Sequence, residues 1–170
     1  MKKLIKVMGI LCLSAVLYAC GSSAQTPSAT MEMKSGESVH SVVTRINDEI
    51  GIAMPADVDD TALKEVFYVN PADVEAYAGK FAMVMTSSDN VVAVKAKEGK
   101  AEDVASALER RLEDVKNSFE QYLPEQFAKA EKGAVIRKGD YVFLLIVGQL
   151  DDTIDQDYDK AKKIIDEAFG

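Results

Sequence analysis

The sequence predicts an α+β domain in which an antiparallel sheet of about four strands packs against helices. Two patterns lead to this prediction. Segments with an apolar residue every three or four positions, which is typical of helices, surround two segments with apolar residues at alternate positions, which is typical of strands. Each strand segment has turn-forming residues at its centre and therefore predicts a β-hairpin. The expected order is helix, short helices, hairpin, long helix, hairpin, helix, and the pattern leaves the strand order open.

The first helix is expected over residues 38–50, with Gly51 as its stop signal. Two shorter helical pieces are expected between residues 55 and 77. The second of them starts at Asn70, which can cap a helix whose first residue is Pro71. The apolar stripe that predicts the first helix contains Val39, Val42, Val43, Ile46 and Ile50.

The first hairpin is expected to start near Lys80 and to turn at residues 87–90, SSDN. The second is expected over AVIRK, a turn at Gly139 and Asp140, and the run YVFLLIV at residues 141–147. That run is apolar on both alternations, so we expect it in the interior of the sheet. The alternating apolar residues of the first hairpin are Phe81, Met83 and Met85, followed by Val92, Val94 and Ala96.

The longest helix is expected between the two hairpins, with Pro124 as the point where it ends or bends. Its apolar stripe contains Val104, Leu108, Leu112, Val115, Phe119 and Tyr122. A last helix is expected near the carboxyl end of the sequence, behind an acidic first turn that suits the helix dipole. The acids of that turn are Asp151, Asp152 and Asp155, and the stripe contains Ile154, Tyr158, Ala161, Ile165 and Ala168.

Residues 1–19 have the pattern of an export signal, because three lysines precede an apolar run. The run of about a dozen residues is shorter than the ~20 that a membrane-spanning helix needs. The segment LYAC, at residues 17–20, resembles a lipobox, in which the cysteine receives diacylglycerol and becomes the mature N-terminus. Cys20 is therefore the expected lipid attachment site. The alternative is an ordinary signal peptide with a chance cysteine.

We expect three parts: a lipoprotein signal peptide at residues 1–19, a flexible tether at residues 20–37 and one globular domain at residues 38–170. Cys12 would leave with the signal, so the mature chain would have no disulfide. Cleavage removes three lysines and no acid, which changes the formal charge from −8 to −11. Such a surface repels nucleic acid and anionic lipid headgroups, so membrane contact is expected through the diacylglycerol alone.

The segment at residues 107–146, together with GIAMP at residues 51–55 and VVAVKAKEG at residues 91–99, resembles a known family. It is similar to the lipoprotein family catalogued as domain of unknown function 4358. The resemblance implies a bacterial surface lipoprotein, and the family has no established activity, cofactor or catalytic residue to transfer. The residues that carry the resemblance include Arg111, Phe119, Tyr122, Leu123, Pro124, Lys138, Gly139 and Tyr141.

The sequence offers no combination of residues for a catalytic or metal site, and we expect no cofactor. His40 is the only histidine, which excludes histidine-rich zinc sites, and we expect it to be solvated or capping. Asp155, Asp157 and Asp159 have alternate spacing, but Lys160 stands where an EF-hand loop needs glycine. We expect these acids, like those at residues 57–60, to serve helix starts.

Arg111 is the first of three candidate binding residues, because it interrupts the apolar stripe between Leu108 and Leu112. A guanidinium on a buried face needs a carboxylate or carbonyl partner. It is therefore expected either in a fixed ion pair, or reaching past the edge of the face, or as an anchor for an anionic ligand. Of these we expect the buried pair, so Arg111→Ala should cost about 3 to 5 kcal/mol, while Arg110→Ala should do little because Arg110 points outward.

Tyr122 and Tyr141 are the other two candidates. With Pro124 and Phe127 they would form a recognition edge if the corner at residues 123–127 lies close to the turn at residues 138–141. The alternative is that these aromatic residues close the core.

The leading functional hypothesis is a noncatalytic binding module on the extracytoplasmic face of the cell membrane, whose partner is an envelope protein or a cell-wall component. The alternative is an extracytoplasmic hydrolase that uses acidic residues on a cell-wall or glycan substrate. That enzyme would need a cavity with at least two convergent carboxylates.

Overall fold

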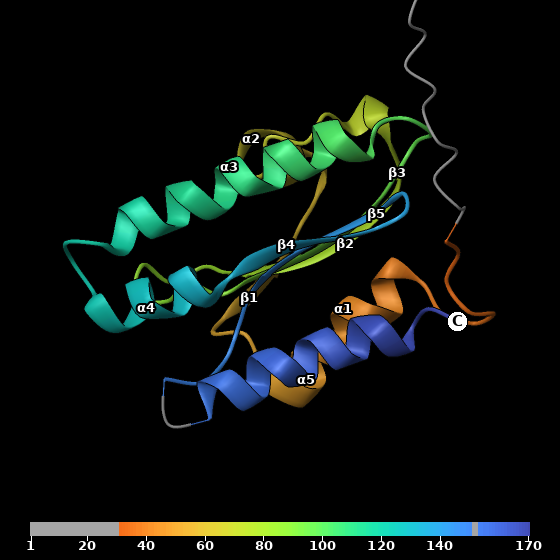
Figure 1. Cartoon of the computed structure of the whole chain (residues 1–170). Coiled ribbons are helices and arrows are strands. Elements are labelled where there is room, and N and C mark those ends of the chain that lie inside the picture. The colour runs from red at the N-terminus through yellow and green to blue at the C-terminus, as the bar shows by residue number, and fades with distance from the viewer. Residues whose placement is uncertain (1–30, 151–152) are drawn as a thin grey trace, which may run out of the picture.

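A five-stranded antiparallel sheet forms the middle layer of the structure, a computed structural model that describes residues 31–150 and 153–170 (Figure 1). The strand order is β1-β2-β3-β5-β4. This architecture confirms the predicted α+β class and adds one strand to the expected four. The strands are β1 (Pro55–Asp57), β2 (Val74–Ala82), β3 (Asn90–Ala96), β4 (Ala134–Lys138) and β5 (Tyr141–Ile146).

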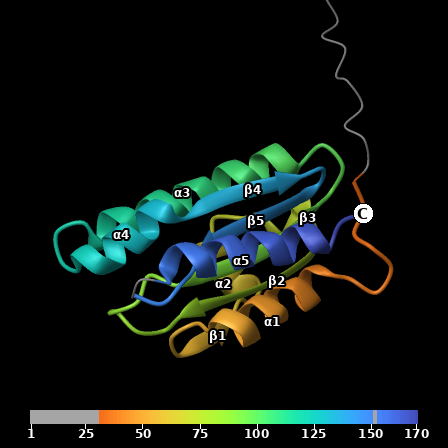
Figure 2. The same cartoon turned by 60° about the horizontal axis from the view of Figure 1, so that its bottom comes forward.

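Helices cover both faces of the sheet, whereas the sequence predicted helices only against a face. Helices α1 (Val39–Ile50) and α5 (Ile154–Glu167) lie side by side on one face (Figure 2). The other face packs against α2 (Asp60–Glu65), α3 (Ala101–Phe119) and α4 (Pro124–Lys132). None of these helices is both long and apolar enough to cross a membrane.

Strands β3 and β5 are buried on both faces of the sheet, which is why a helical layer is needed on each face. Val91 and Ala93 of β3 belong to the core beneath α1 and α5, while Val92 and Val94 belong to the core beneath α3. All six residues of β5 are buried in the same alternating way, which confirms its predicted interior position. Burial of each large apolar side chain contributes about 1.5 to 3 kcal/mol.

Helix α1 agrees closely with its prediction. Ser38 caps its first turn: its hydroxyl accepts from the Ser41 N–H, and the Ser38 N–H donates to the Ser41 hydroxyl. The predicted apolar stripe is buried. Gly51, at φ +90°, ends the helix in a backbone conformation that favours glycine. The last helix is also found where expected, although Asp151 and Asp152 lie outside the described residues.

Two predictions in the middle of the chain were wrong. The segment after Asn70 is helical only over a short 3₁₀ turn, η1 (Pro71–Asp73), and becomes β2 at Val74 because its backbone pairs along β3. The first hairpin is displaced as a result, so Met83 and Met85 lie in the loop beyond β2. Strand β1 was missed, since three residues beginning with proline give no alternation to detect.

Pro124 both follows the end of α3 and begins α4, which the sequence had not predicted as a separate helix. Proline suits the first turn of a helix because its missing N–H would have no partner there. Helix α4 then ends at Gly133, directly before β4. This junction places α4 beside α3 at the end of the sheet (Figure 1).

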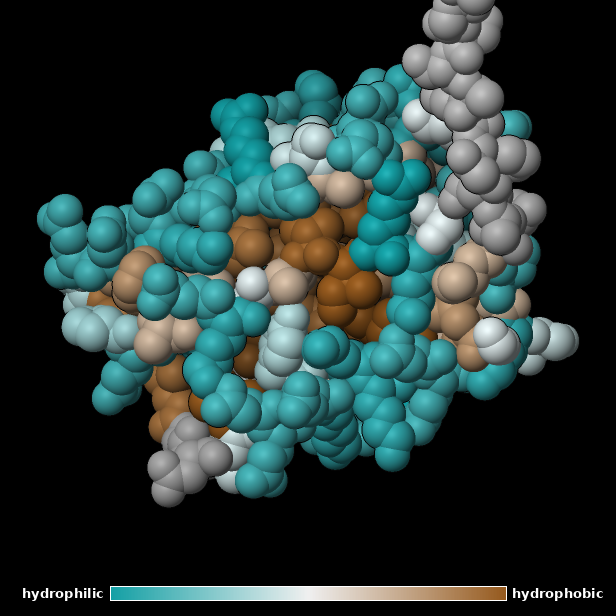
Figure 3. All heavy atoms as spheres, viewed as in Figure 1, coloured by the Kyte–Doolittle hydropathy of each residue, from teal (hydrophilic) through white to brown (hydrophobic). Residues whose placement is uncertain are grey.

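Strand β4 is an edge of the sheet and is half-buried between the helical layers. Arg137 reaches Glu102 of α3 at 2.7 Å, and Lys138 reaches Asp166 of α5 at 2.8 Å. Figure 3 shows apolar surface in the middle of this side of the molecule, framed by hydrophilic side chains. Charged residues on an edge strand disfavour pairing with other chains.

The chain enters the domain beside the β4–β5 turn, where Met31 lies against Gly139. Part of the predicted tether contacts the domain at this end: the Lys34 N–H donates to the Ala168 carbonyl at 2.9 Å, and Met33 forms a β-bridge with Phe169. The expected signal peptide and Cys20 lie outside the described residues.

Gly133 gives a direct test of the α4–β4 junction. A Cβ atom there would lie 2.9 Å from the carbonyl oxygens of both Ala130 and Leu145, which are backbone atoms of α4 and β5. Gly133→Ala should therefore lower the free energy of unfolding by about 1 to 3 kcal/mol, as overpacking typically does. Gly170→Ala, in open space, is the control for urea denaturation. Equal stability of the two variants would contradict this junction.

Candidate functional site

A cluster of buried polar side chains lies where β3 begins, and we call it the polar cluster. In the described part of the chain, these are the only polar or charged residues that are buried. Two of them lie in the loop before β3, one is the first residue of β3, and two lie on consecutive turns of α4. The members are Ser88, Asp89, Asn90, Gln126 and Lys129.

Asp89 and Lys129 form an ion pair in which the side chains are only 8% and 4% exposed. Lys129 Nζ lies 2.5 Å from Asp89 Oδ1 and also donates to the Gly148 carbonyl at 3.1 Å. The other carboxylate oxygen, Oδ2, accepts from the Ala53 N–H at 3.1 Å and from the Ser87 hydroxyl at 2.8 Å. The pair therefore joins four chain segments: the loop after α1, the loop before β3, α4 and the segment after β5.

Gln126 and Asn90 extend the cluster on either side of Ser88. Gln126 Oε1 accepts from the Ser88 N–H at 2.8 Å, and the Ser88 hydroxyl lies 3.0 Å from the same oxygen. Asn90 Nδ2 donates to the Ser88 carbonyl at 2.9 Å. These bonds hold the loop before β3 against α4.

A cavity of about 360 Å³ opens beside the polar cluster. Asp89, Gln126 and Lys129 line it together with apolar and further polar side chains. The apolar ones include Ile52, Val84 and Leu150, and the further polar ones are Thr86, Ser87 and Gln149. A concave site with apolar walls and a few convergent polar groups is the usual form of a ligand site.

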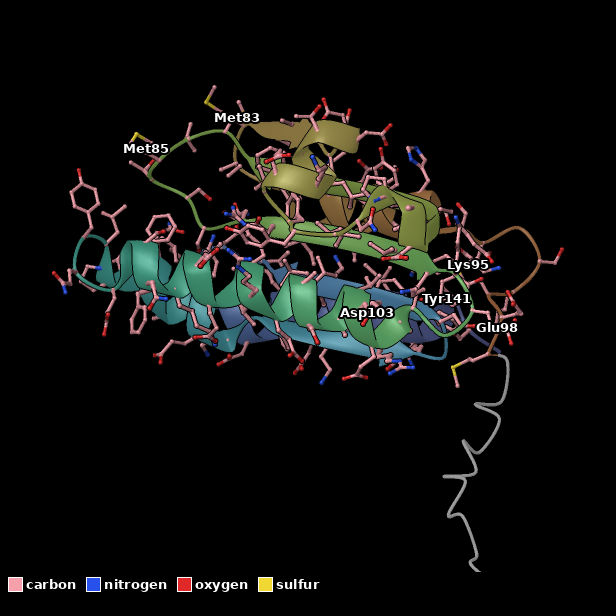
Figure 4. All side chains as sticks on the ribbon, turned by 90° about the horizontal axis from the view of Figure 1, so that it is seen from above. Met83, Met85, Lys95, Glu98, Asp103 and Tyr141 are labelled. Atoms are coloured by element: carbon pink, nitrogen blue, oxygen red, sulfur yellow. The ribbon has the colours of Figure 1, made fainter. Side chains whose placement is uncertain are left out.

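Large exposed apolar side chains gather at this same end of the molecule, which we call the distal end. Met83 and Met85 point away from the body there, while Lys95, Glu98 and Tyr141 lie at the opposite end, where the chain enters (Figure 4). In the ranges that the structure describes, Met31 is the one large exposed apolar residue at the entry end. Those of the distal end are Met83 and Met85, Met54, whose carbonyl accepts from the Met83 N–H, Leu150, which lines the cavity, and Tyr122, in the loop between α3 and α4.

Arg111 contacts the polar cluster from α3. Its Nε and Nη2 both donate to Asn90 Oδ1 at 3.3 Å, and the guanidinium lies 5.4 Å from the centre of the Phe67 ring. Burial lowers the pKa of Arg111, although a guanidinium keeps its charge in proteins. Within residues 31–150 and 153–170, Arg111 has no carboxylate in ion-pair range, so the partner is an amide carbonyl and the expected ion pair is absent. Its role as a ligand anchor stays a prediction.

Tyr122 and Tyr141 lie at opposite ends of the domain, so they do not share a recognition edge. Tyr141 is 5% exposed and donates to Glu32 Oε2 at 2.8 Å, and both burial and this hydrogen bond raise its pKa. It belongs to the entry end, where it pairs with Lys138 of β4 and where Arg137 of the same strand reaches Glu102 in the first turn of α3. Tyr122 follows the last turn of that 19-residue helix and is 72% exposed.

The described residues provide little for catalysis or metal binding. They contain no group of three or more His, Cys, Asp or Glu residues placed to hold a metal ion. Asp89 is the one carboxylate among those residues that lines the cavity, and Lys129 already holds it. His40 lies on the outer face of α1, along a shallow hollow lined by that helix and the turn before it.

A comparison with known families places the chain. The family described as Domain of unknown function (DUF4358) matches residues 48–147. The chain belongs to this family. The matched segment contains every member of the polar cluster and confirms the resemblance seen in the sequence. No curated protein and no solved structure matches the chain.

Sequence reasoning missed the polar cluster of this DUF4358 chain because α4 was not recognised as a helix. Gln126 and Lys129 are three residues apart and lie on one helical face with Ala130. Once that face is known to be buried, a lysine and a glutamine on it require polar partners.

The buried ion pair of the DUF4358 domain predicts strong coupling between its two partners. Lys129→Met or Asp89→Asn alone should each cost about 3 to 5 kcal/mol, because each leaves a buried polar group without its partner. The double variant should lose clearly less than the sum in a double-mutant cycle measured by urea denaturation. Lys132, the last residue of α4, forms an exposed pair with Asp155 of α5, so Lys132→Ala should cost less than about 1 kcal/mol. Additive losses from the single variants would contradict the coupling.

Arg111 predicts a smaller effect than an ion pair would give. Arg111→Ala should cost about 1.5 to 3 kcal/mol, the usual value for a hydrogen bond to a charged group. Arg110 is exposed and its guanidinium lies 3.8 Å from the centre of the Tyr68 ring, so Arg110→Ala should cost less than about 1 kcal/mol. Thermal unfolding of both variants checks this. Equal, small losses would mean that the contact with Asn90 contributes nothing.

Proposed function

We propose that the protein is a noncatalytic binding module that is anchored through a diacylglycerol on Cys20 to the extracytoplasmic face of the cell membrane. Its partner is an envelope protein or a cell-wall component, which it binds with the distal end. The export signal and the lipobox-like segment support the anchor, and the distal end supports the binding role.

One observation carries the binding role: exposed apolar side chains collect around a cavity at a single end. Scattered exposed apolar residues are normal, but a group beside a concave site is typical of an interaction surface. Methionine is common on such surfaces because its side chain is unbranched and polarizable.

The position of this surface suits a tethered protein. The described chain begins beside the β4–β5 turn, and the distal end lies at the opposite end of α3 and of the sheet (Figure 1). An anchor that precedes residue 31 would hold the entry end toward the membrane and leave the distal end facing outward.

The anchor is tested by Cys20→Ala. The variant should remain uncleaved and should not take up radiolabelled fatty acid in the producing cell, because the thiol is the acceptor of the diacylglycerol. A serine-to-alanine change nearby, Ser22→Ala, leaves the thiol in place and should be labelled normally. A labelled Cys20→Ala protein would refute the anchor.

The binding surface is tested by site-specific photocrosslinking in intact cells. A photoreactive residue in place of Met85 should give a discrete crosslinked product, because that side chain lies at the distal end and is 88% exposed. The same residue in place of Glu98, in an exposed turn at the entry end, should not give that product (Figure 4). Absence of a product from Met85, or the same product from both positions, would contradict the proposal.

A further inference from the structure

We infer that the distal cavity binds the carbonyl oxygen of a peptide bond flanked by small apolar side chains, with Gln126 and Lys129 as hydrogen-bond donors. This inference rests on the proposed function, because it names the ligand chemistry of the same end. Five features of the cavity lead to it.

The amide of Gln126 has a donor without a protein acceptor. The Ser88 backbone N–H can only donate, so it fixes Oε1 as the atom that faces Ser88 and leaves Nε2 on the other side. In the described part of the chain, Nε2 has no acceptor within hydrogen-bond distance, although Gln126 is only 7% exposed. Gln126 lines the cavity.

Lys129 supplies a second donor. An ammonium group has three N–H bonds, and two are directed at Asp89 Oδ1 and the Gly148 carbonyl. The third has no acceptor among the residues that the structure describes. Because Lys129 also lines the cavity, two side chains that are largely buried each offer an N–H to a ligand there.

Asp89, the carboxylate that lines the cavity, has no free oxygen to accept a hydrogen bond from a ligand. Both oxygens of Asp89 are engaged, Oδ1 by Lys129 and Oδ2 by Ala53 and Ser87. A ligand atom that hydrogen-bonds to these donors must therefore be an acceptor, and an oxygen is the common acceptor in biological ligands.

Charge decides between a neutral oxygen and a carboxylate. Asp89 and Lys129 cancel each other, so the site has no net charge, and the chain as a whole carries −8. An anion would gain nothing from the pair and would be repelled by the rest of the surface. A carbonyl oxygen meets no such repulsion.

The apolar part of the cavity lining and the cavity volume further restrict the ligand. Ile52, Val84 and Leu150 make part of the lining apolar, and a volume of about 360 Å³ is near the lower limit for ligand cavities. A short stretch of peptide satisfies both requirements, since it presents a carbonyl oxygen with alkyl side chains beside it. Such a stretch occurs in a loop of an envelope protein and in the short peptides of a cell wall.

The test is a titration of the full-length chain followed by the Gln126 side-chain amide resonances in ¹H–¹⁵N spectra. The probes are N-acetyl-L-Ala-L-Ala-amide and N-acetyl-D-Ala-D-Ala-amide, with sodium acetate as the anion. A saturable shift with either capped peptide, and no comparable shift with acetate, is expected. A response to the L-peptide assigns the ligand to a protein segment and a response to the D-peptide to a wall peptide. No shift with either peptide, or an equal shift with acetate, overturns the inference.

A matched pair of variants distinguishes the loss of the Gln126 hydrogen-bond donor from a loss of folding. Gln126→Glu keeps an oxygen for the Ser88 N–H but removes the amide donors, and it should weaken peptide binding at least tenfold. Gln121→Glu makes the same change at an exposed position before α4 and should bind as the unchanged protein does. The Ser88 amide resonance reports whether the Gln126→Glu fold is intact. If it is not, the titration of the unchanged protein decides alone.

The two proposals fail separately. A discrete crosslink from Met85 with a silent Gln126 resonance would refute the peptide site and leave the binding surface standing. A saturable shift of the Gln126 resonance without a Met85 crosslink would support the peptide site and refute the binding surface.

Discussion

The ion pair between Asp89 and Lys129 determines how the distal end is built. Two charges with so little solvent cost several kcal/mol each to bury, and their mutual attraction offsets this only when the remaining hydrogen-bonding groups are also satisfied. Here the Gly148 carbonyl, the Ala53 N–H and the Ser87 hydroxyl satisfy them. The geometry of the pair therefore fixes four chain segments relative to one another, and a shift of any one of them would expose a buried charge.

The rest of the distal end follows from this arrangement. Asn90 is the first residue of β3, so the sheet itself positions the cluster, and Arg111 connects the cluster to α3. Helix α4, which has few apolar residues of its own, is held through Gln126, Lys129 and the buried Ala130. The cavity is the space left between these fixed elements, and the exposed methionines belong to the loops around it. A rigid base beneath adaptable side chains is a suitable design for a binding surface.

Local patterns in the sequence determined much of the fold. The stripe of α1, the stripe of α3 as far as Phe119 and the two-sided apolar run of β5 were correctly predicted, because each depends on residues close together in the chain. Tyr122, the last residue of the predicted stripe, lies beyond α3 and is exposed. Strand β2 was placed wrongly since the local capping signal at Asn70 and Pro71 was real, but pairing with β3 overrode it after three residues. Arg111 was recognised as an exception within its stripe. Its partner, Asn90, was not predictable because 21 residues separate them and only the tertiary structure brings them together.

The ammonium group of Lys129 allows the most direct test of this account. Exposed lysines exchange their ammonium protons too fast to observe near neutral pH, whereas a buried and hydrogen-bonded group exchanges slowly. We predict a slowly exchanging ¹⁵Nζ–H signal that is absent from Lys129→Met and lost or strongly shifted in Asp89→Asn. If Lys129 gave no such signal, or if Asp89→Asn left it unchanged, the ion pair would not be the interaction that organises the distal end.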